Sequence, residues 1–135
     1  MSTIAQTAAV SNKAQWAGYI VSGVVIAFLL FDGAIKLIPL DIVVEASAEF
    51  GIPVHLTRTL GVMTLVFTIL YAIPRTSVLG AILLTGYLGG AVWTHLRIGS
   101  PVFSHLLFGV YLGLMIWGGL YLRDERLRAL VPLRR

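Results

Sequence analysis

The sequence predicts an all-α integral membrane four-helix bundle, with a short amphipathic interfacial helix between the first and second spans. The chain of 135 residues is 58% hydrophobic and only 12% charged, whereas soluble domains carry about a quarter charged residues. A transmembrane helix needs roughly 20 predominantly apolar residues. Four stretches of about that length contain no Lys, Arg, Asp or Glu: 14–31, 59–74, 76–96 and 98–122.

The first span is expected from Ala14 to Leu37, after a flexible N-terminal segment of residues 1–13. Ser11 or Asn12 can cap this helix, and Pro39 ends it because proline cannot continue a helix. Residues 41–50, DIVVEASAEF, then predict the interfacial helix. Their acidic residues recur every four positions and share one face, and the segment is too short to cross a bilayer.

The other three spans follow with short connections, so residues 14–122 form a single membrane domain. We expect helices from Val54 to Ile73, from Ser77 to Leu96 and from Val102 to Leu122. A basic tail of residues 123–135 follows, with enough alternation to be partly helical.

Glycine pairs in the last two spans have the spacing of close helix contacts. Gly86 and Gly90 form one G-x-x-x-G, and Gly109 and Gly113 form another. Small residues four apart let helix backbones approach closely in a membrane. We therefore expect both pairs to be packing surfaces.

The distribution of basic residues predicts the orientation. One set of helix ends carries seven Lys and Arg residues and the other carries three, namely Lys36, Arg58 and Arg97. The end richer in basic residues is usually cytoplasmic. We expect a multi-pass protein of the plasma (inner) membrane with both termini in the cytoplasm. The same asymmetry argues against a dual-topology dimer.

Several function classes are excluded. Most of the net positive charge of +4 lies on one set of helix ends, where the orientation of the chain in the membrane explains it. No nucleic-acid partner is therefore expected. The absence of cysteine excludes thiol chemistry and Cys-ligated clusters in this chain. The sequence also has no phosphate-binding glycine loop and no nucleotide fingerprint.

The expected partners are the lipid bilayer, and either other membrane subunits or further copies of the chain.

The titratable residues of the spans gather at the predicted outer end of the bundle. Charge in or beside a bilayer is costly and often marks a functional site. We take Asp32 and His95 as candidate catalytic residues. The candidate ligand-binding residues are Lys36, Arg58, Trp93, Arg97 and His105.

Asp32 and Lys36 are four residues apart and share a helix face. They form either an interfacial ion pair, with Lys36 reaching toward the headgroups, or a restrained carboxylate that handles a proton. Arg58 is an interfacial anchor, a bidentate partner for Asp32, or a site for an anionic headgroup.

His95 and His105 lie on either side of a tight turn and should be close together. A histidine pair could bind metal or haem, but no Cys, HxxxH or ExxH accompanies it, and no metal site is predicted. A hydrogen-bonding or proton-transferring role toward a lipid-soluble substrate is favoured. Trp93 also fits an aromatic belt at the interface.

Three segments together resemble the DoxX-like membrane proteins: FDGAIKLIP, AEFGIPVHLTRTLGV and AVWTHLRIGSPVFSHLLFG. The resemblance covers about residues 14–122 and implies a small four-helix membrane protein. Some members of this family are subunits of thiosulfate–quinone oxidoreductase. Members often carry a Glu shortly after a Leu-Gly in the second span, where this chain has Thr64 after Leu60 and Gly61.

Three functional hypotheses follow. In the first, the chain is a subunit of, or accessory to, a quinone-linked membrane redox system, with a quinone as the cofactor. Polar donors would bind the headgroup, and Asp32 would relay a proton. In the second, the chain is a non-catalytic structural or assembly component. In the third, it is a small proton-coupled transporter that depends on Asp32.

Overall fold

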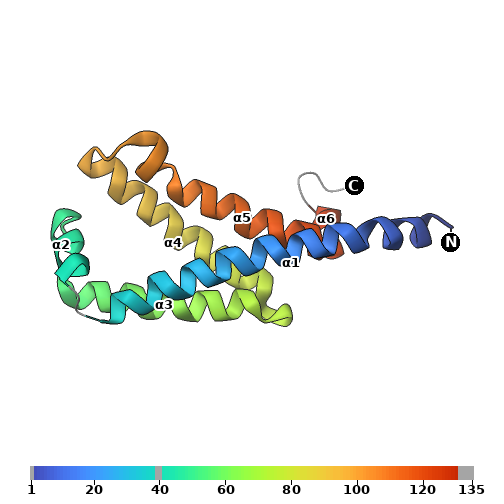
Figure 1. The fold of residues 1–135 in the computed structure, drawn as a ribbon, viewed down its shortest axis with the longest axis horizontal. Coiled ribbons are helices and arrows are strands. Elements are labelled where there is room, and N and C mark those ends of the chain that lie inside the picture. Colours follow the sequence, from blue (N-terminus) through green and yellow to red (C-terminus); the bar gives the residue numbers. More distant parts are fainter. Residues whose placement is uncertain (1, 39–40, 131–135) are drawn as a thin grey trace.

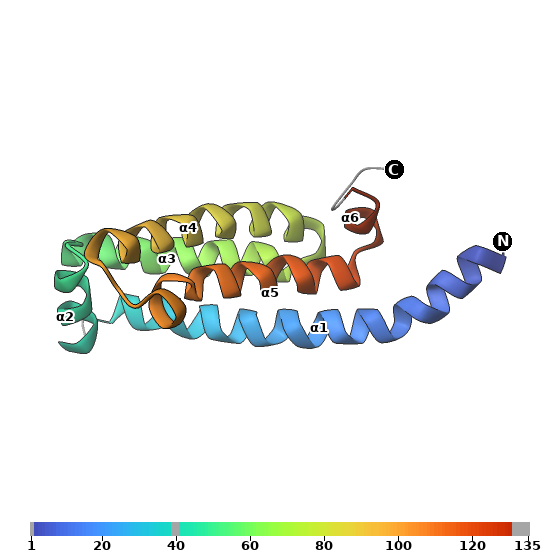
Figure 2. The same cartoon turned by 90° about the horizontal axis from the view of Figure 1, so that it is seen from above.

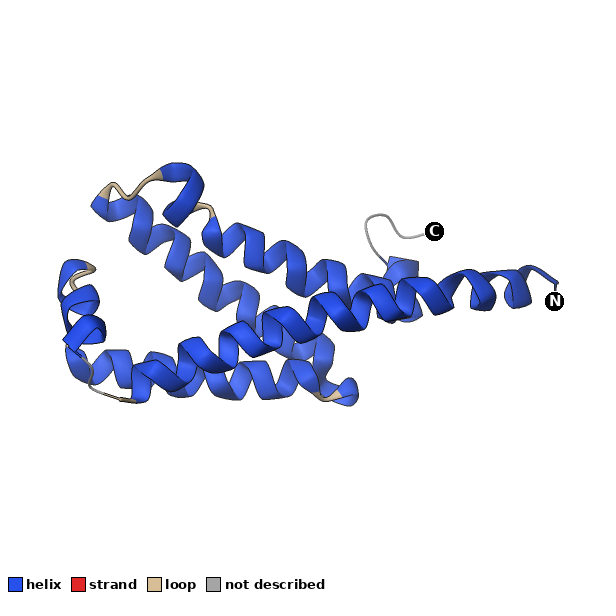
Figure 3. Cartoon of the chain, viewed as in Figure 1, coloured by secondary structure: helices blue, strands red, loops and turns tan. Residues whose placement is uncertain are grey.

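The computed structural model describes residues 2–38 and 41–130, and within these ranges it contains helices and short connections without strands (Figure 3). Among the described residues, four segments are long and apolar enough to cross a membrane: Asn12–Leu37, His55–Ala72, Pro74–Ile98 and Val102–Arg123. The predicted all-α four-helix architecture is therefore confirmed. The elements are α1 (Ser2–Leu37), α2 (Asp41–Glu49), α3 (Val54–Ala72), η1 (Pro74–Thr76), α4 (Ser77–Ile98), η2 (Val102–Leu106), α5 (Phe108–Arg123) and α6 (Glu125–Leu130).

Two of the predicted spans begin differently in the structure, while the other span boundaries agree with the prediction to within one or two residues. Helix α1 begins at Ser2 instead of Ala14, because no helix-breaking residue lies in the polar segment before the span. The fourth span does not begin as a regular α-helix. Its first turn, η2, is π-helical, with the amide of Leu107 bonded to the carbonyl of Val102 at 2.9 Å. A π-turn inserts one extra residue and shifts the side chains around it.

The spans form a four-sided arrangement in which α1 packs against α3 and α5, and α4 packs against the same two helices. Figure 1 shows that the two halves, α1 with α3 and α4 with α5, lie close together near α6 and diverge toward α2. The short helix α2 lies across the open end and contacts α3. The helical part of the C-terminal tail, α6, packs beside α5.

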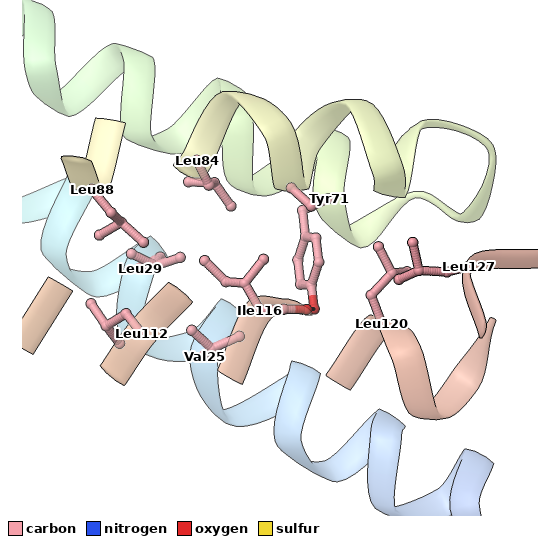
Figure 4. Close-up of a cluster of buried hydrophobic side chains, with 10 residues drawn as sticks. Val25, Leu29, Tyr71, Leu84, Leu88, Leu112, Ile116, Leu120 and Leu127 are labelled. Carbon is pink, nitrogen blue, oxygen red and sulfur yellow. Dashed lines mark hydrogen bonds between the residues drawn. The ribbon is translucent and has the colours of Figure 1, made fainter. Parts of the chain in front are cut away.

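The end of the bundle near α6 is tightly packed around Tyr71, whose side chain is fully buried (Figure 4). Its hydroxyl donates a hydrogen bond to the carbonyl of Ile116 at 2.6 Å. Ser22 then donates to the Tyr71 oxygen at 3.1 Å, and Arg123 Nε donates to Ser22 at 3.1 Å. This chain of bonds joins α1, α3 and α5. Leucine, isoleucine and valine side chains fill the space around it: Val25, Leu29, Leu84, Leu88, Leu112, Ile116 and Leu120.

Close helix contacts use different glycines from those expected. A Cβ on Gly80 would lie 2.3 Å from the Tyr71 amide nitrogen, and one on Gly119 would lie 2.5 Å from Ser22 Oγ. Gly33 of α1 and Gly61 of α3 also face each other, since a Cβ on Gly61 would lie 2.9 Å from the Gly33 carbonyl oxygen. Glycine at these positions allows the helix backbones to approach closely, whereas any larger residue would collide with the neighbouring helix.

The two predicted G-x-x-x-G surfaces are mostly not contact surfaces within this chain. A Cβ on Gly86, Gly90 or Gly113 would meet no atom within 4 Å. Only Gly109 packs closely, with its Cβ position 3.0 Å from Val92. The prediction was wrong for Gly86 and Gly90, because α4 diverges from the α1–α3 half at this level and these two glycines face open space instead of a partner helix.

Candidate functional site

A cavity of about 590 Å³ lies between the diverging helices at the α2 end of the bundle. Side chains of α1, α2, α3, α4, η2 and α5 line it, and most of them are apolar. Its volume falls within the 300–1,000 Å³ that is usual for small-molecule sites. The polar groups on its wall are few: Asp32, Lys36, Ser47, Thr57, Tyr87, Thr94, His95 and His105.

The first polar cluster joins α1 to α4 through Lys36. Its ammonium nitrogen donates to Asp32 Oδ2 at 2.6 Å and to the Tyr87 hydroxyl oxygen at 2.7 Å. The Asp32 and Lys36 side chains are only 29% and 23% exposed, so their charges are held largely within the protein. The contact of Gly33 with Gly61 fixes α1 against α3 and leaves the Asp32–Lys36 face directed toward the cavity.

The second polar cluster contains the two histidines. Helix α4 ends at Ile98 and is capped by Gly99, whose φ of 73° is the left-handed conformation that glycine favours. The chain then turns back, and the rings of His95 and His105 lie 6.0 Å apart. His95 Nδ1 is 2.9 Å from Ser100 Oγ, and His105 Nδ1 is 2.7 Å from Ser104 Oγ.

The Nδ1 bonds leave the Nε2 atoms of both histidines as the ring nitrogens able to contact a ligand. The ring of Phe50, from the end of α2, packs edge-on against His95 at 5.0 Å between centroids. Two His rings alone do not make a metal site, and the described residues contain no group of three metal-ligating side chains.

Three of the candidate residues lie outside this cavity. Arg58 is exposed and lines a separate small depression beside α1 and α2. The ion pair seen among the described side chains joins Lys36 to Asp32, so Arg58 is not the partner of Asp32. Arg97 donates instead to the backbone carbonyl of Phe50 and ties α4 to the end of α2. Trp93 is 61% exposed on the outer surface of α4.

The structure thus brings Asp32, Lys36, His95 and His105 to one cavity and adds Tyr87, which the sequence did not single out. Tyr87 lies in the run Gly86-Tyr87-Leu88-Gly89-Gly90 in the middle of an apolar span. A polar aromatic residue between small residues was the available signal. This signal was overlooked because Gly86 and Gly90, on either side of Tyr87, had been assigned to a helix-packing surface.

The fold and the site together define a class: a small polytopic helical membrane protein with a largely apolar, partly open cavity between its spans and a few polar groups on the cavity wall. The chain belongs to the DoxX-like family, whose sequence profile matches residues 20–119. The matched range contains the polar cavity residues of α1, α4 and η2. No curated protein matches the chain, and no solved structure matches it.

Proposed function

We propose that the cavity binds a lipid-soluble quinone, and that the chain is a subunit of, or accessory to, a quinone-linked membrane redox system. The observation that carries this proposal is the Asp32–Lys36–Tyr87 cluster on the wall of an otherwise mostly apolar cavity of about 590 Å³. An apolar pocket with a few placed polar groups is the usual form of a site for such a molecule.

The lining suits both parts of a quinone. Phe28 of α1 and Phe108 of α5 stack edge-to-face at 5.3 Å and are partly exposed at the cavity rim. Aromatic edges of this kind accommodate a flat ring and an alkyl tail. Lys36, Tyr87 and the histidines supply hydrogen-bond donors for the carbonyl oxygens.

A bound quinone would supply two-electron, two-proton chemistry. In this proposal Lys36 and His95 orient the headgroup, and Asp32 holds or passes a proton through its bond to Lys36. The electrons would come from a partner protein with its own carrier. Arg58, Trp93 and Arg97 act outside the cavity, as contacts to lipid headgroups or to that partner.

The test is quinone content after gentle solubilisation. Organic extracts of the purified wild-type protein should contain quinone in near-stoichiometric amount by mass spectrometry. Gly86→Leu should remove it, because the new side chain enters the open space of the cavity. Gly89→Leu is the matched control, since Gly89 is also unobstructed but does not line the cavity. A wild-type protein that binds no quinone, purified or added, would contradict the proposal.

A structural or assembly role is the second candidate. Gly89, Gly113 and Gly118 meet nothing within 4 Å, so another helix could approach α4 or α5 there. In that case Gly89→Leu or Gly113→Leu would release a co-purifying subunit, while Gly86→Leu would leave the complex intact. Quinone binding predicts the opposite ranking.

For localisation we propose the plasma membrane with both termini in the cytoplasm, based on the seven-to-three count of basic residues. A reporter that is active only outside the cytoplasm should be silent when fused after Arg135. It should be active when inserted at Gly51, between α2 and α3. Strong activity of the C-terminal fusion would place the C-terminus outside the cytoplasm and contradict the proposed orientation.

A further inference from the structure

The hydrogen-bond directions around Lys36 determine what kind of atom the cavity can receive. Lys36 is paired with Asp32 at 2.6 Å and therefore carries an ammonium group, which has three N–H donors and no acceptor. The bond of 2.7 Å to Tyr87 must then run from Lys36 to the phenol oxygen. The hydroxyl hydrogen of Tyr87 is consequently free of this bond and points elsewhere.

Neither that hydrogen nor the third N–H of Lys36 has an acceptor among the described residues. Lys36 uses two of its donors, on Asp32 and on Tyr87. The Tyr87 hydroxyl makes no second hydrogen bond within residues 2–38 and 41–130. Both residues line the cavity. Two donors from two different helices are therefore available to one ligand atom or group.

The lysine also strengthens the tyrosine as a donor. A hydroxyl whose oxygen accepts a bond from a cation is polarised, because hydrogen bonds in a chain reinforce one another in a low-dielectric site. Such a donor favours an oxygen acceptor that carries, or gains, negative charge. A carbonyl oxygen of a quinone fits this requirement, since negative charge builds up on it when the ring is reduced.

The surroundings of Tyr87 leave room for a flat ring. Gly86 and Gly90 are one helical turn apart on α4, and both line the cavity beside Tyr87. A Cβ at either position would meet no atom within 4 Å. A planar ring can therefore lie against the backbone of α4 with one edge near the Tyr87 hydroxyl.

We propose that Tyr87, polarised by Lys36, donates the hydrogen bond that holds a carbonyl oxygen of the ligand, and so selects quinones over apolar molecules of the same shape. This inference rests on the proposed quinone site and assigns the contact that recognises the headgroup. Asp32 does not touch the ligand in this arrangement. It positions Lys36, which in turn positions Tyr87.

The test compares two ligands and two phenylalanine variants. The ligands are a decyl-substituted benzoquinone and the matching decyl-substituted arene without oxygen atoms. Tyr87→Phe should weaken quinone binding about tenfold, as expected for loss of one hydrogen bond, and leave arene binding unchanged. Tyr111→Phe is the control, because the Tyr111 hydroxyl bonds to the Phe103 carbonyl at 2.9 Å and lies outside the cavity.

An infrared measurement reports the contact directly. With a ¹³C-labelled quinone carbonyl, the bound stretch should lie below its position in hydrocarbon solvent for the wild type and for Tyr111→Phe. It should return toward that position in Tyr87→Phe. An unshifted carbonyl in the wild type would overturn the inference without any variant.

The outcomes separate the two proposals. If the wild type binds quinone and Tyr87→Phe binds it equally, with the same carbonyl stretch, the role of Tyr87 is wrong and the quinone site stands. If the wild type binds the arene as tightly as the quinone, the headgroup selection is wrong. If the wild type binds neither ligand, both proposals fail.

Discussion

The two ends of this bundle use the same residue types for opposite purposes. Near α6, glycine brings backbones into contact, as where a Cβ on Gly80 would lie 2.3 Å from Tyr71. Toward α2, Gly86 and Gly90 of the same helix face a cavity and touch nothing within 4 Å. Polar groups differ in the same way: the Ser22–Tyr71–Arg123 network is internally bonded, whereas donors of Lys36 and Tyr87 remain available.

The comparison shows that the role of a glycine motif in a membrane helix depends on whether another helix lies opposite it. No hydrophobic force closes a gap between spans in lipid, because lipid tails are as apolar as the side chains. A bundle that is fastened at one end can therefore remain open at the other. We therefore expect the α6 end around Tyr71, the closed end, to supply most of the stability, whereas the α2 end, the open end, contains the candidate site.

The largest expected effect is at the closed end. Gly80→Val should destabilise the protein by about 3 kcal/mol or more, because the added side chain collides with the backbone of Tyr71 and Leu70. Gly89→Val on the same helix meets nothing and should have little effect. Thermal unfolding in detergent, followed by circular dichroism, measures both. Equal melting temperatures would show that the closed end is not the stable part.

Tyr71→Phe should cost about 1–3 kcal/mol. It removes a buried hydroxyl that bonds to the Ile116 carbonyl and accepts from Ser22, leaving the Ser22 hydroxyl with one partner fewer. Tyr111→Phe should cost much less, since its hydroxyl is exposed. The same unfolding assay compares them. An unchanged stability of Tyr71→Phe would mean that apolar packing alone stabilises this end of the bundle.

At the open end, Lys36→Met should cost about 1–2 kcal/mol, because it leaves Asp32 without its partner in a partly buried position. The double variant Lys36→Met with Asp32→Asn should recover most of this loss. A double-mutant cycle isolates the coupling. If the single and double variants unfold identically, the pair contributes nothing to stability and the Asp32 carboxylate tolerates isolation.

The smallest expected effect is at Arg58. It is exposed and has no acidic partner among the described side chains, so Arg58→Ala should change stability by less than about 0.5 kcal/mol. Arg97→Ala should cost slightly more, because Arg97 bonds to the Phe50 carbonyl. A large loss for Arg58→Ala would indicate that it has a structural role at the depression beside α1 and α2.

Much of the fold was predictable because bilayer thickness and helix-breaking residues are local signals. Four apolar stretches, Pro39, Pro53 and the Gly99–Pro101 turn place the spans and connections within a few residues. The pairing of Asp32 with Lys36 and the closeness of His95 to His105 also followed from spacing alone. Membership of the DoxX-like family was confirmed by the profile match.

What the sequence could not provide depends on distant contacts. Tyr87 meets Lys36 across 51 positions of sequence, and nothing local indicates that pair. The packing roles of Gly33, Gly61 and Gly80 depend on which helix lies opposite each of them. The divergence of the two halves, and hence the cavity, is a property of the whole bundle. The functional roles of the candidate residues stay predictions.

The length of α1 has a mechanical consequence. Its 36 residues make a helix with a contour length of ~54 Å at 1.5 Å per residue, which exceeds the roughly 40–45 Å of a whole bilayer with headgroups. Figure 2 shows its N-terminal part projecting beyond the other helices. Because α1 is held against α5 at Gly18 and Ser22, a tilt of α1 about that point moves its cavity end, with Asp32 and Lys36, and its projecting N-terminal part in opposite directions. A fluorophore attached near Asn12 should therefore act as a lever-arm sensor of cavity occupancy.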